Sequence, residues 1–138
     1  MRSETSAGSD RLARLANAYP LLARIDHPDW TRIIEHAHAM RMDAHALLLS
    51  RDTRCENFVL LLDGTVRIHQ LAEDGREITL YRIAPGDICV MSLASLIHSQ
   101  PFKAFAQTDT AIEALALSGA DFHQAMAVSS VFRGWVLG

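Results

Sequence analysis

The chain has 138 residues, enough for one domain with its own core, so no second module is required. Apolar residues make up 49% and charged residues 21%, which is the composition of an ordinary soluble globular protein. The formal net charge is −3 and the basic residues are scattered, which argues against a nucleic-acid-binding surface, because phosphate neutralisation needs clustered Lys and Arg.

The two cysteines, Cys55 and Cys89, are too few for an iron–sulfur cluster or a zinc site held by four thiolates. We interpret them as reduced thiols of an intracellular protein. The first ten residues lack the apolar stretch of a signal peptide, and no segment is apolar over the length that spans a bilayer. We therefore expect a soluble cytoplasmic protein that has no membrane partner.

The chain begins with a polar segment over residues 1–10, which is rich in Ser and Gly and which we expect to be disordered. A single domain is expected over residues 11–138. Its first element is predicted to be a helix, because Leu12, Leu15 and Tyr19 recur at helical spacing until a proline interrupts them.

A second short helix is indicated by the sequence DHPDW. Asp26 or His27 precedes its first turn, and Pro28 suits its first position because a proline there loses no hydrogen bond. The buried face of this helix is predicted to consist of Trp30, Ile33 and Ile34.

From residue 44 to residue 117 the pattern changes to short strands separated by turn residues. A first strand is expected over Leu47–Ser50. Two further strands, Phe58–Leu62 and Thr65–Leu71, flank the dipeptide Asp63-Gly64, which is typical of a tight hairpin turn. On the second of these strands, alternation should place Val66 and Ile68 on one face and Arg67 and His69 on the other.

Further turns recur about every dozen residues, which favours an antiparallel sandwich or barrel over a βαβ fold. Their sequences are Glu73-Asp74-Gly75 and Pro85-Gly86-Asp87, and the strands that follow them are predicted at Glu77–Ile83 and Ile88–Val90. After a less regular stretch, a last pair of strands is expected around Asp109, over Lys103–Thr108 and Ala111–Leu117.

The chain ends in two predicted helices. Ser118 to Asp121 fits the capping-box pattern, and Phe122 and Met126 follow on one apolar stripe. Ser129 or Ser130 could cap the second helix, whose stripe is predicted to be Phe132, Trp135 and Val136. Because this stripe stops within two turns, we expect that the intact protein is longer than the sequence given.

The run FVLLLDGTVRIHQLAEDGREITLYRIAPGDI, over Phe58–Ile88, resembles the cyclic-nucleotide-binding β-roll of the CRP/FNR family of bacterial regulators. The matching parts are a Gly after an apolar strand, then Val-Arg-Ile, Asp-Gly-Arg-Glu, and an apolar strand leading to Gly86-Asp87. With the C-terminal helices, the resemblance covers Trp30 to Gly138. It implies a double-stranded β-helix, or jelly roll, with short flanking helices. It also implies a homodimer, formed through a long helix that begins near Ser129 and continues into a DNA-binding winged helix-turn-helix outside this sequence.

The sequence departs from the cyclic nucleotide binders of this family at two places. A Gly-Glu-Leu stretch and an Arg-Ser pair hold the ribose and the cyclic phosphate there, whereas this chain has Val90-Met91-Ser92 and Phe102-Lys103. Lys103 could supply a positive charge, but not the bidentate fork of an arginine. The departures argue against cyclic AMP or GMP as the effector. They predict a more apolar pocket for an unidentified small molecule, lined by Gly86, Asp87, Met91, Ser92, Phe102 and Lys103.

Three other interpretations remain open. Cys89 lies just after the Gly86-Asp87 pair and is a candidate redox-sensing thiol, although a structural role is commoner for cysteines. His36, His38 and His98 could belong to a metal-dependent cupin-like enzyme, an alternative that shares the jelly roll. The roll could also be a dimerisation scaffold without a ligand. No phosphate loop, zinc-protease motif or nucleophile elbow is present, so we expect a regulatory domain rather than an enzyme.

Overall fold

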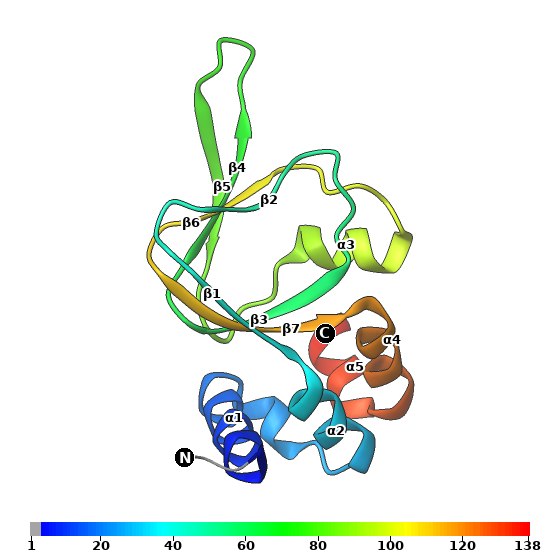
Figure 1. Cartoon of the computed structure of the whole chain (residues 1–138). Helices are drawn as coiled ribbons and strands as arrows, with labels where there is room; N and C mark the ends of the chain where they lie inside the picture. The colour runs from blue at the N-terminus through cyan, green and yellow to red at the C-terminus, as the bar shows by residue number, and fades with distance from the viewer. Residues whose placement is uncertain (1–3) are drawn as a thin grey trace.

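The computed structural model describes residues 4–138, with side chains from Asp10 onward, and it has two parts (Figure 1). A roll of short β-strands forms the upper part in this view, and helices from both ends of the chain gather beneath it. The hairpin of β4 and β5 projects from the roll on the side opposite these helices. The predicted jelly roll with flanking helices is confirmed.

The helices are α1 (Glu4–Ala18), a 3₁₀ turn η1 (Pro20–Arg24), α2 (Pro28–His36), α3 (Val90–His98), α4 (Gly119–Val128) and α5 (Ser130–Leu137). The strands are β1 (His38–Met42), β2 (Leu47–Leu49), β3 (Asn57–Asp63), β4 (Val66–Leu71), β5 (Glu77–Ile83), β6 (Phe105–Thr108) and β7 (Ile112–Ser118). The helix α1 begins at Glu4, whereas the sequence pattern predicted disorder over residues 1–10; residues 1–3 of that prediction lie outside the described residues.

Three helices begin at residues whose side chains cap the first turn. His27 caps α2 by accepting a hydrogen bond from the Asp29 amide through Nδ1, at 3.0 Å. The Ser118 hydroxyl accepts from the Asp121 amide at the start of α4, and the Ser129 hydroxyl accepts from the Phe132 amide at the start of α5. Each cap satisfies one of the amides that a helix leaves without an internal partner.

The strands form two antiparallel sheets, in the order β1-β7-β3 and β2-β6-β4-β5. The hairpin predicted at Asp63-Gly64 is wrong, because β3 pairs with β7 while β4 pairs with β5 and β6. The chain changes sheet at this turn. Gly64 has a φ of +88°, and a Cβ there would lie 2.3 Å from the Ala111 carbonyl oxygen, so the crossing requires a glycine.

Two other predicted strands also differ. The strands β6 and β7 flank Asp109 as expected, but they belong to different sheets and do not pair with each other. The predicted strand Ile88–Val90 is wrong: Val90 begins α3, which occupies much of the stretch that the pattern left irregular. The apolar residues there fit either element, since short apolar runs do not distinguish a strand from a helix.

The buried residues form two clusters. The first, which we call the helical-layer cluster, joins α1, η1, α2, α4 and α5 to the outer face of the three-stranded sheet and contains Tyr19, Trp30, Phe58, Phe122 and Phe132. The second, the roll-interior cluster, lies between the two sheets and consists of Leu61, Val66, Ile68, Ile83, Phe102, Ala104, Ala106, Ile112 and Ala114. The roll therefore has a core of its own, separate from the helices.

Candidate functional site

A small cavity of about 30 Å³ lies between the two sheets of the roll. Among the described residues, its walls are aliphatic or aromatic except at Cys89 and Ser92, and they carry no charged side chain. The lining residues are Leu48, Leu49, Phe58, Val59, Leu61, Val66, Ile68, Ile83, Cys89, Ser92 and Ala106. Such a lining suits an apolar group, because a buried charge without a partner is costly.

The N-terminus of α3 closes one side of this cavity. Cys89 caps the helix, and its sulfur accepts hydrogen bonds from the Ser92 amide at 3.4 Å and from the Ser92 hydroxyl at 3.0 Å. The Tyr81 hydroxyl lies 3.7 Å from the same sulfur and accepts from the Met91 amide. Burial and the neighbouring Cys89 raise the pKa of Tyr81, so its hydroxyl keeps its proton at neutral pH.

The predicted pocket residues lie at different places. Ser92 lines the cavity, Met91 packs against the roll-interior cluster, and Phe102 is fully buried within that cluster. Lys103 is exposed, and its carbonyl accepts a hydrogen bond from the Gln70 side chain. The geometry therefore brings Ser92, Met91 and Phe102 toward the roll interior and leaves the lysine at the surface.

The remaining two predicted residues, Gly86 and Asp87, face the helical layer instead. The Asp87 carboxylate accepts a hydrogen bond from the Ala84 amide within the turn, at 2.9 Å. Its carbonyl accepts from the Tyr19 hydroxyl, at 3.4 Å. Gly86 has a φ of +99°, which the turn requires and which glycine adopts without strain.

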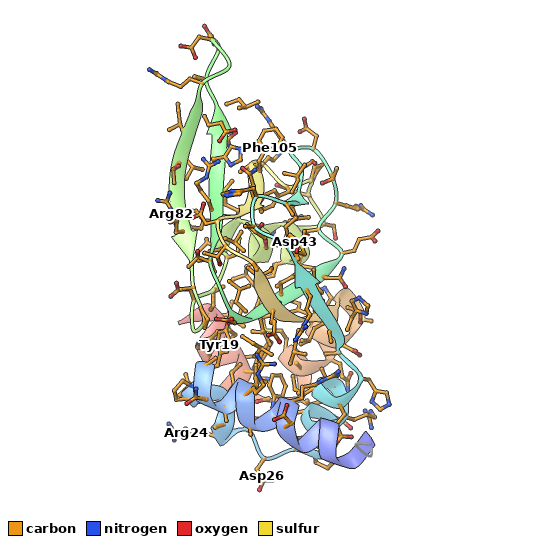
Figure 2. The ribbon with its side chains drawn as sticks, turned by 60° about the vertical axis from the view of Figure 1, so that its left-hand side comes forward. Tyr19, Arg24, Asp26, Asp43, Arg82 and Phe105 are labelled. Carbon is orange, nitrogen blue, oxygen red and sulfur yellow. The ribbon has the colours of Figure 1, made fainter. Side chains whose placement is uncertain are left out.

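Tyr19 is a residue that sequence reasoning assigned only to a helix. Its hydroxyl donates to the Asp87 carbonyl and accepts from the amide of Leu61, a cavity-lining residue, at 3.0 Å. Its ring packs edge-on against Trp135 of α5, at 5.4 Å between centroids. Burial raises the pKa of Tyr19 to about 12, so the hydroxyl is a permanent donor. Figure 2 shows Tyr19 at the junction between the helices and the roll.

The histidines of the metal alternative do not form a site. His36 ends α2 and contacts the Arg32 carbonyl, His38 begins β1, and His98 ends α3. Among the side chains that the structure describes, from Asp10 onward, no three of His, Cys, Asp or Glu come together as potential ligands. The structure therefore lends no support to a cupin-like metal centre.

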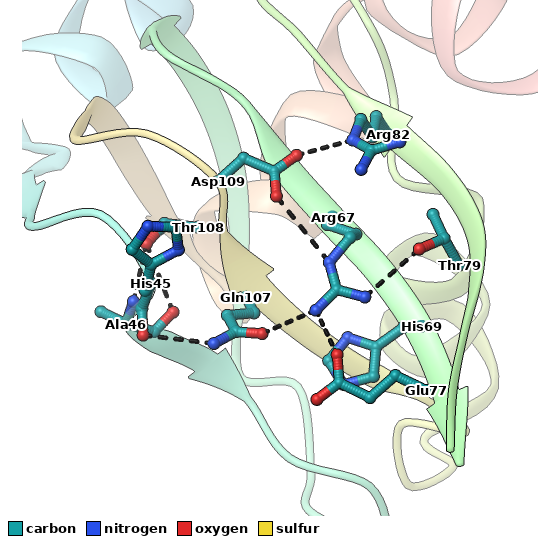
Figure 3. Close-up of polar contacts among 10 residues, drawn as sticks. All are labelled: His45, Ala46, Arg67, His69, Glu77, Thr79, Arg82, Gln107, Thr108 and Asp109. Carbon is teal, nitrogen blue, oxygen red and sulfur yellow. Dashed lines mark hydrogen bonds and ion pairs between the residues drawn. The ribbon is translucent and has the colours of Figure 1, made fainter. Parts of the chain in front are cut away.

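The outer face of the four-stranded sheet carries a polar network (Figure 3). Arg67 contacts Glu77, Gln107, Asp109 and Thr79, and its side chain is only 16% exposed. The ion pair with Arg67 lowers the pKa of Glu77. His69 shares this face as predicted, but it is buried and stacks on Phe105. This network lies on the opposite side of β4 from Val66 and Ile68, so it does not border the cavity.

Residues 39–129 match the family model of the cyclic nucleotide-binding domain, and the chain belongs to that family. Domains of this family are typically non-catalytic regulatory domains. No curated protein sequence matches the chain. Within residues 4–138, no helix is both long and apolar enough to cross a membrane.

Solved structures with this fold include domains of bacterial transcriptional regulators. The sensor domain of the transcriptional regulator DNR from Pseudomonas aeruginosa gives a TM-score of 0.78 at 14% identity, covering 94% of this chain and 85% of that one. The N-terminal domain of a transcriptional regulator from Streptomyces coelicolor gives 0.69 at 20% identity, covering 89% and 86%. At identities this low, the structural similarity shows a shared fold and no more.

Regulatory subunits of protein kinases are also similar. The regulatory subunit of a cAMP-independent protein kinase A from Trypanosoma cruzi, bound to guanosine, gives a TM-score of 0.76 at 15% identity and covers 94% of this chain. The chain spans less than half the length of that subunit and of two others like it, at 44% to 46%. Both groups of structures place this fold in regulatory proteins.

Proposed function

We propose that this chain is the effector-sensing domain of a bacterial CRP/FNR-type transcription regulator. A small molecule would bind inside the roll, and the response would pass through the C-terminal helix to a dimer partner and to a DNA-binding winged helix outside this sequence. The family match, the Phe58–Ile88 pattern and the coverage of two domains of bacterial transcriptional regulators support this proposal.

The observation that carries the proposal is the set of contacts made by Tyr19. Its hydroxyl bonds both to the cavity wall at Leu61 and to the turn that leads into α3, at Asp87. Its ring touches Trp135 in α5, the helix from which the dimerisation helix would continue. A ligand that moves the cavity wall or α3 would therefore change the packing of α5. A ligand shifts such an equilibrium only by its difference in affinity between the two arrangements.

The cavity also restricts the effector. A cyclic nucleotide carries a phosphate charge, and the described lining offers no cation to receive it. The space of about 30 Å³ holds little more than a water molecule, so a larger ligand must push α3 outward. We therefore infer a small, uncharged and largely apolar effector whose entry displaces the N-terminus of α3.

A thermal-shift screen of the 138-residue chain tests this function. The probes are cyclic AMP, cyclic GMP, haem, divalent metals, and the neutral compounds indole, benzene and short-chain alcohols. We expect a saturable rise in Tm with neutral apolar probes and none with the cyclic nucleotides. Binding at about 100 times Kd stabilises the folded state by about 2.7 kcal/mol, which such a screen detects readily.

The variant Ala106→Val is the control, because it adds two methyl groups to the cavity wall. It should abolish the response to the apolar probes while leaving the domain folded. A saturable rise with cyclic AMP that survives in Ala106→Val would overturn the apolar effector. Silence across the whole panel would favour the ligand-free scaffold.

A further inference from the structure

A second hollow lies on the outside of the roll, beside the cavity between the two sheets. We call it the outer pocket; it has a volume of about 200 Å³ and is lined by Met40, Leu48, Leu49, Val59 and the segment 54–57. The strands β1, β2 and β3 contribute the apolar side chains of this lining, and the charged side chains belong to the segment 54–57. The outer pocket therefore has an apolar side and a polar rim.

The outer pocket and the cavity share one wall. Leu48, Leu49 and Val59 line both of them, and each of the three residues is half-buried. Because the same side chains border both hollows, this shared wall is a single layer of side chains. Rotation of these side chains would join the cavity of about 30 Å³ to the outer pocket.

The strand that carries two side chains of the shared wall is held weakly. β2 is three residues long and forms one edge of the four-stranded sheet, with β6 as its neighbour. The register of that pairing shifts between Leu47 and Leu49, which leaves Leu48 as the extra residue of a bulge. A half-buried leucine at such a position can change rotamer without breaking the hydrogen bonds of the ladder.

The rim of the outer pocket carries two charges of opposite sign. Arg54 and Glu56 are both exposed, and within the part of the chain that the structure describes, neither side chain has an ion pair or a hydrogen bond. Asn57 adds an amide donor and an amide acceptor to the rim. A neutral hydrogen-bonding group can bond to such a rim, whereas an ion would be attracted by one charge and repelled by the other.

We propose that the outer pocket is the entry site of the roll and that it binds a neutral, ring-sized molecule with one hydrogen-bonding group, such as an aromatic alcohol. An apolar cavity of about 150 Å³ can hold a benzene ring, so the outer pocket has room for a ring and a small head group. The ring packs against the shared wall, and the head group bonds to the rim.

This site deepens the proposed function, because it supplies the route by which an effector reaches the cavity. From the outer pocket, the ring passes the shared wall and meets Cys89 and Ser92 at the N-terminus of α3. The inference rests on the proposed function for this second step alone, since binding in the outer pocket requires neither a movement of α3 nor DNA.

Benzyl alcohol, titrated into the methyl-labelled 138-residue chain and followed by NMR, tests the site. We expect saturable shifts of the Met40 and Leu48 methyl signals and intermolecular NOEs from the ring to both. Ile68 and Ile83 line the cavity but not the outer pocket. Shifts confined to these two residues would overturn the outer site and leave the cavity effector standing. The absence of any saturable shift would also overturn the outer site.

Two tryptophan substitutions at opposite ends of β3 provide matched variants. Asn57→Trp places a large ring at the rim of the outer pocket, whereas Asp63→Trp places the same ring at an exposed position away from it. Asn57→Trp should weaken the binding of benzyl alcohol at least about tenfold, because the added ring occupies the space of the ligand. Asp63→Trp should change the Kd by less than about twofold, as expected for a surface substitution. An unchanged Kd in a folded Asn57→Trp chain would overturn the site.

A series of ligands with the same ring tests the rim. Benzoate and benzylamine carry a negative and a positive charge where benzyl alcohol is neutral, and both should bind the unmodified chain more weakly. Glu56→Gln should strengthen the binding of benzoate about threefold, and Arg54→Gln should do the same for benzylamine, because exposed charges have effects of this size. A lower Kd for benzoate than for benzyl alcohol in the unmodified chain would overturn the neutral ligand class.

The variant Ala106→Val separates this inference from the proposed function, because Ala106 lines the cavity but not the outer pocket. A response to benzyl alcohol that Asn57→Trp removes and Ala106→Val keeps would support the outer site and remove the cavity effector. A response that Ala106→Val removes and Asn57→Trp keeps would do the reverse. Loss of the response in both variants would support entry through the outer pocket into the cavity.

Discussion

The helical-layer cluster and the roll interior are both buried, but they are filled in different ways. Phe132 alone contacts four other aromatic rings, those of Trp30, Phe58, Phe122 and Trp135, at 5.3 to 6.0 Å between centroids. The roll interior has one fully buried aromatic side chain, Phe102, and is otherwise aliphatic, with three alanines and the cavity.

This difference indicates which region stabilises the domain and which region can change shape. Interlocking aromatic rings bury large areas in fixed geometry, so the helical layer should be stiff and costly to change. Small aliphatic side chains around a cavity leave room for adjustment. Tyr19 connects the two regions through its ring on one side and its hydroxyl on the other.

The largest expected effect comes from removing the centre of the helical layer. Phe132→Ala should reduce the free energy of unfolding by about 3–5 kcal/mol, because it deletes a buried ring and leaves a void among rigid neighbours. Urea denaturation measures this. The comparison is Ile68→Val in the roll interior, which should cost only about 0.5–1.5 kcal/mol. Equal losses would mean that the helical layer is not the stiffer region.

The next largest loss of unfolding free energy is expected when the contact between the two regions is removed. Tyr19→Phe keeps the ring against Trp135 but leaves the buried Leu61 amide without its partner, which should cost about 1–3 kcal/mol. Denaturant unfolding measures the stability. In a Trp30→Phe background, the fluorescence of Trp135 should respond to an apolar probe in the chain that keeps Tyr19 and not in the Tyr19→Phe variant. A response of the same size in both would break the proposed link.

Two matched alanine substitutions compare the packing of the regions directly. Ala125 is fully buried in the helical layer, and Ala106 is nearly so beside the cavity. Ala125→Val should lower the free energy of unfolding by about 1–3 kcal/mol through overpacking. Ala106→Val should change it by less than about 1 kcal/mol, because the cavity receives the added methyl groups. Chemical denaturation of both variants is the measurement, and the reverse order would contradict the comparison.

The smallest expected effect concerns the polar network on the outer face of the four-stranded sheet, where Arg67 forms ion pairs with Glu77 and Asp109. Arg67 lowers the pKa of Glu77 below its usual value of 4.5. The folded state therefore gains stability from the ionised carboxylate above pH 4.5 and loses it as the pH falls through the lowered folded pKa.

The Tm of the unmodified chain, measured against that of Glu77→Gln between pH 7 and pH 3, tests this sign. We expect the unmodified chain to have the higher Tm near pH 7 and the gap to close below pH 4.5. The His69 Nε2 atom also lies 3.9 Å from the Glu77 carboxylate. The variant His69→Phe, which keeps an aromatic ring but removes the titratable imidazole, is therefore the control for a contribution of His69. A gap that widens toward acid pH would reverse the argument.

The sequence predicted much of the local structure. The caps at Ser118 and Ser129, the buried face of α2 and the turn at Glu73–Gly75 depend on residues within one or two turns of each other, so local chemistry is enough to identify them. The Gly64 turn shows the limit. Its dipeptide indicated a tight turn correctly, but the choice of partner strand depended on β7, which is remote in sequence.

The candidate site was predicted less completely. Ser92, which the family pattern singled out, lines the cavity, but that pattern did not indicate that the carbonyl of Asp87 bonds to Tyr19. Tyr19 was identified only as part of a helix, because no local signal shows that its hydroxyl reaches Leu61 and Asp87. The hydrogen bond from the Cys55 amide to the Ser95 hydroxyl was equally hidden, since it forms only when α3 packs against the segment before β3.

The composition class, the caps, the turns and the family pattern could all be identified from the sequence, because they depend on residue identity and short spacing. The pairing of the strands, the helical state of residues 90–98 and the set of side chains at the cavity became evident from the folded chain alone. These features arise from contacts between distant segments. Their energies depend on packing geometry, which no short stretch of the chain contains.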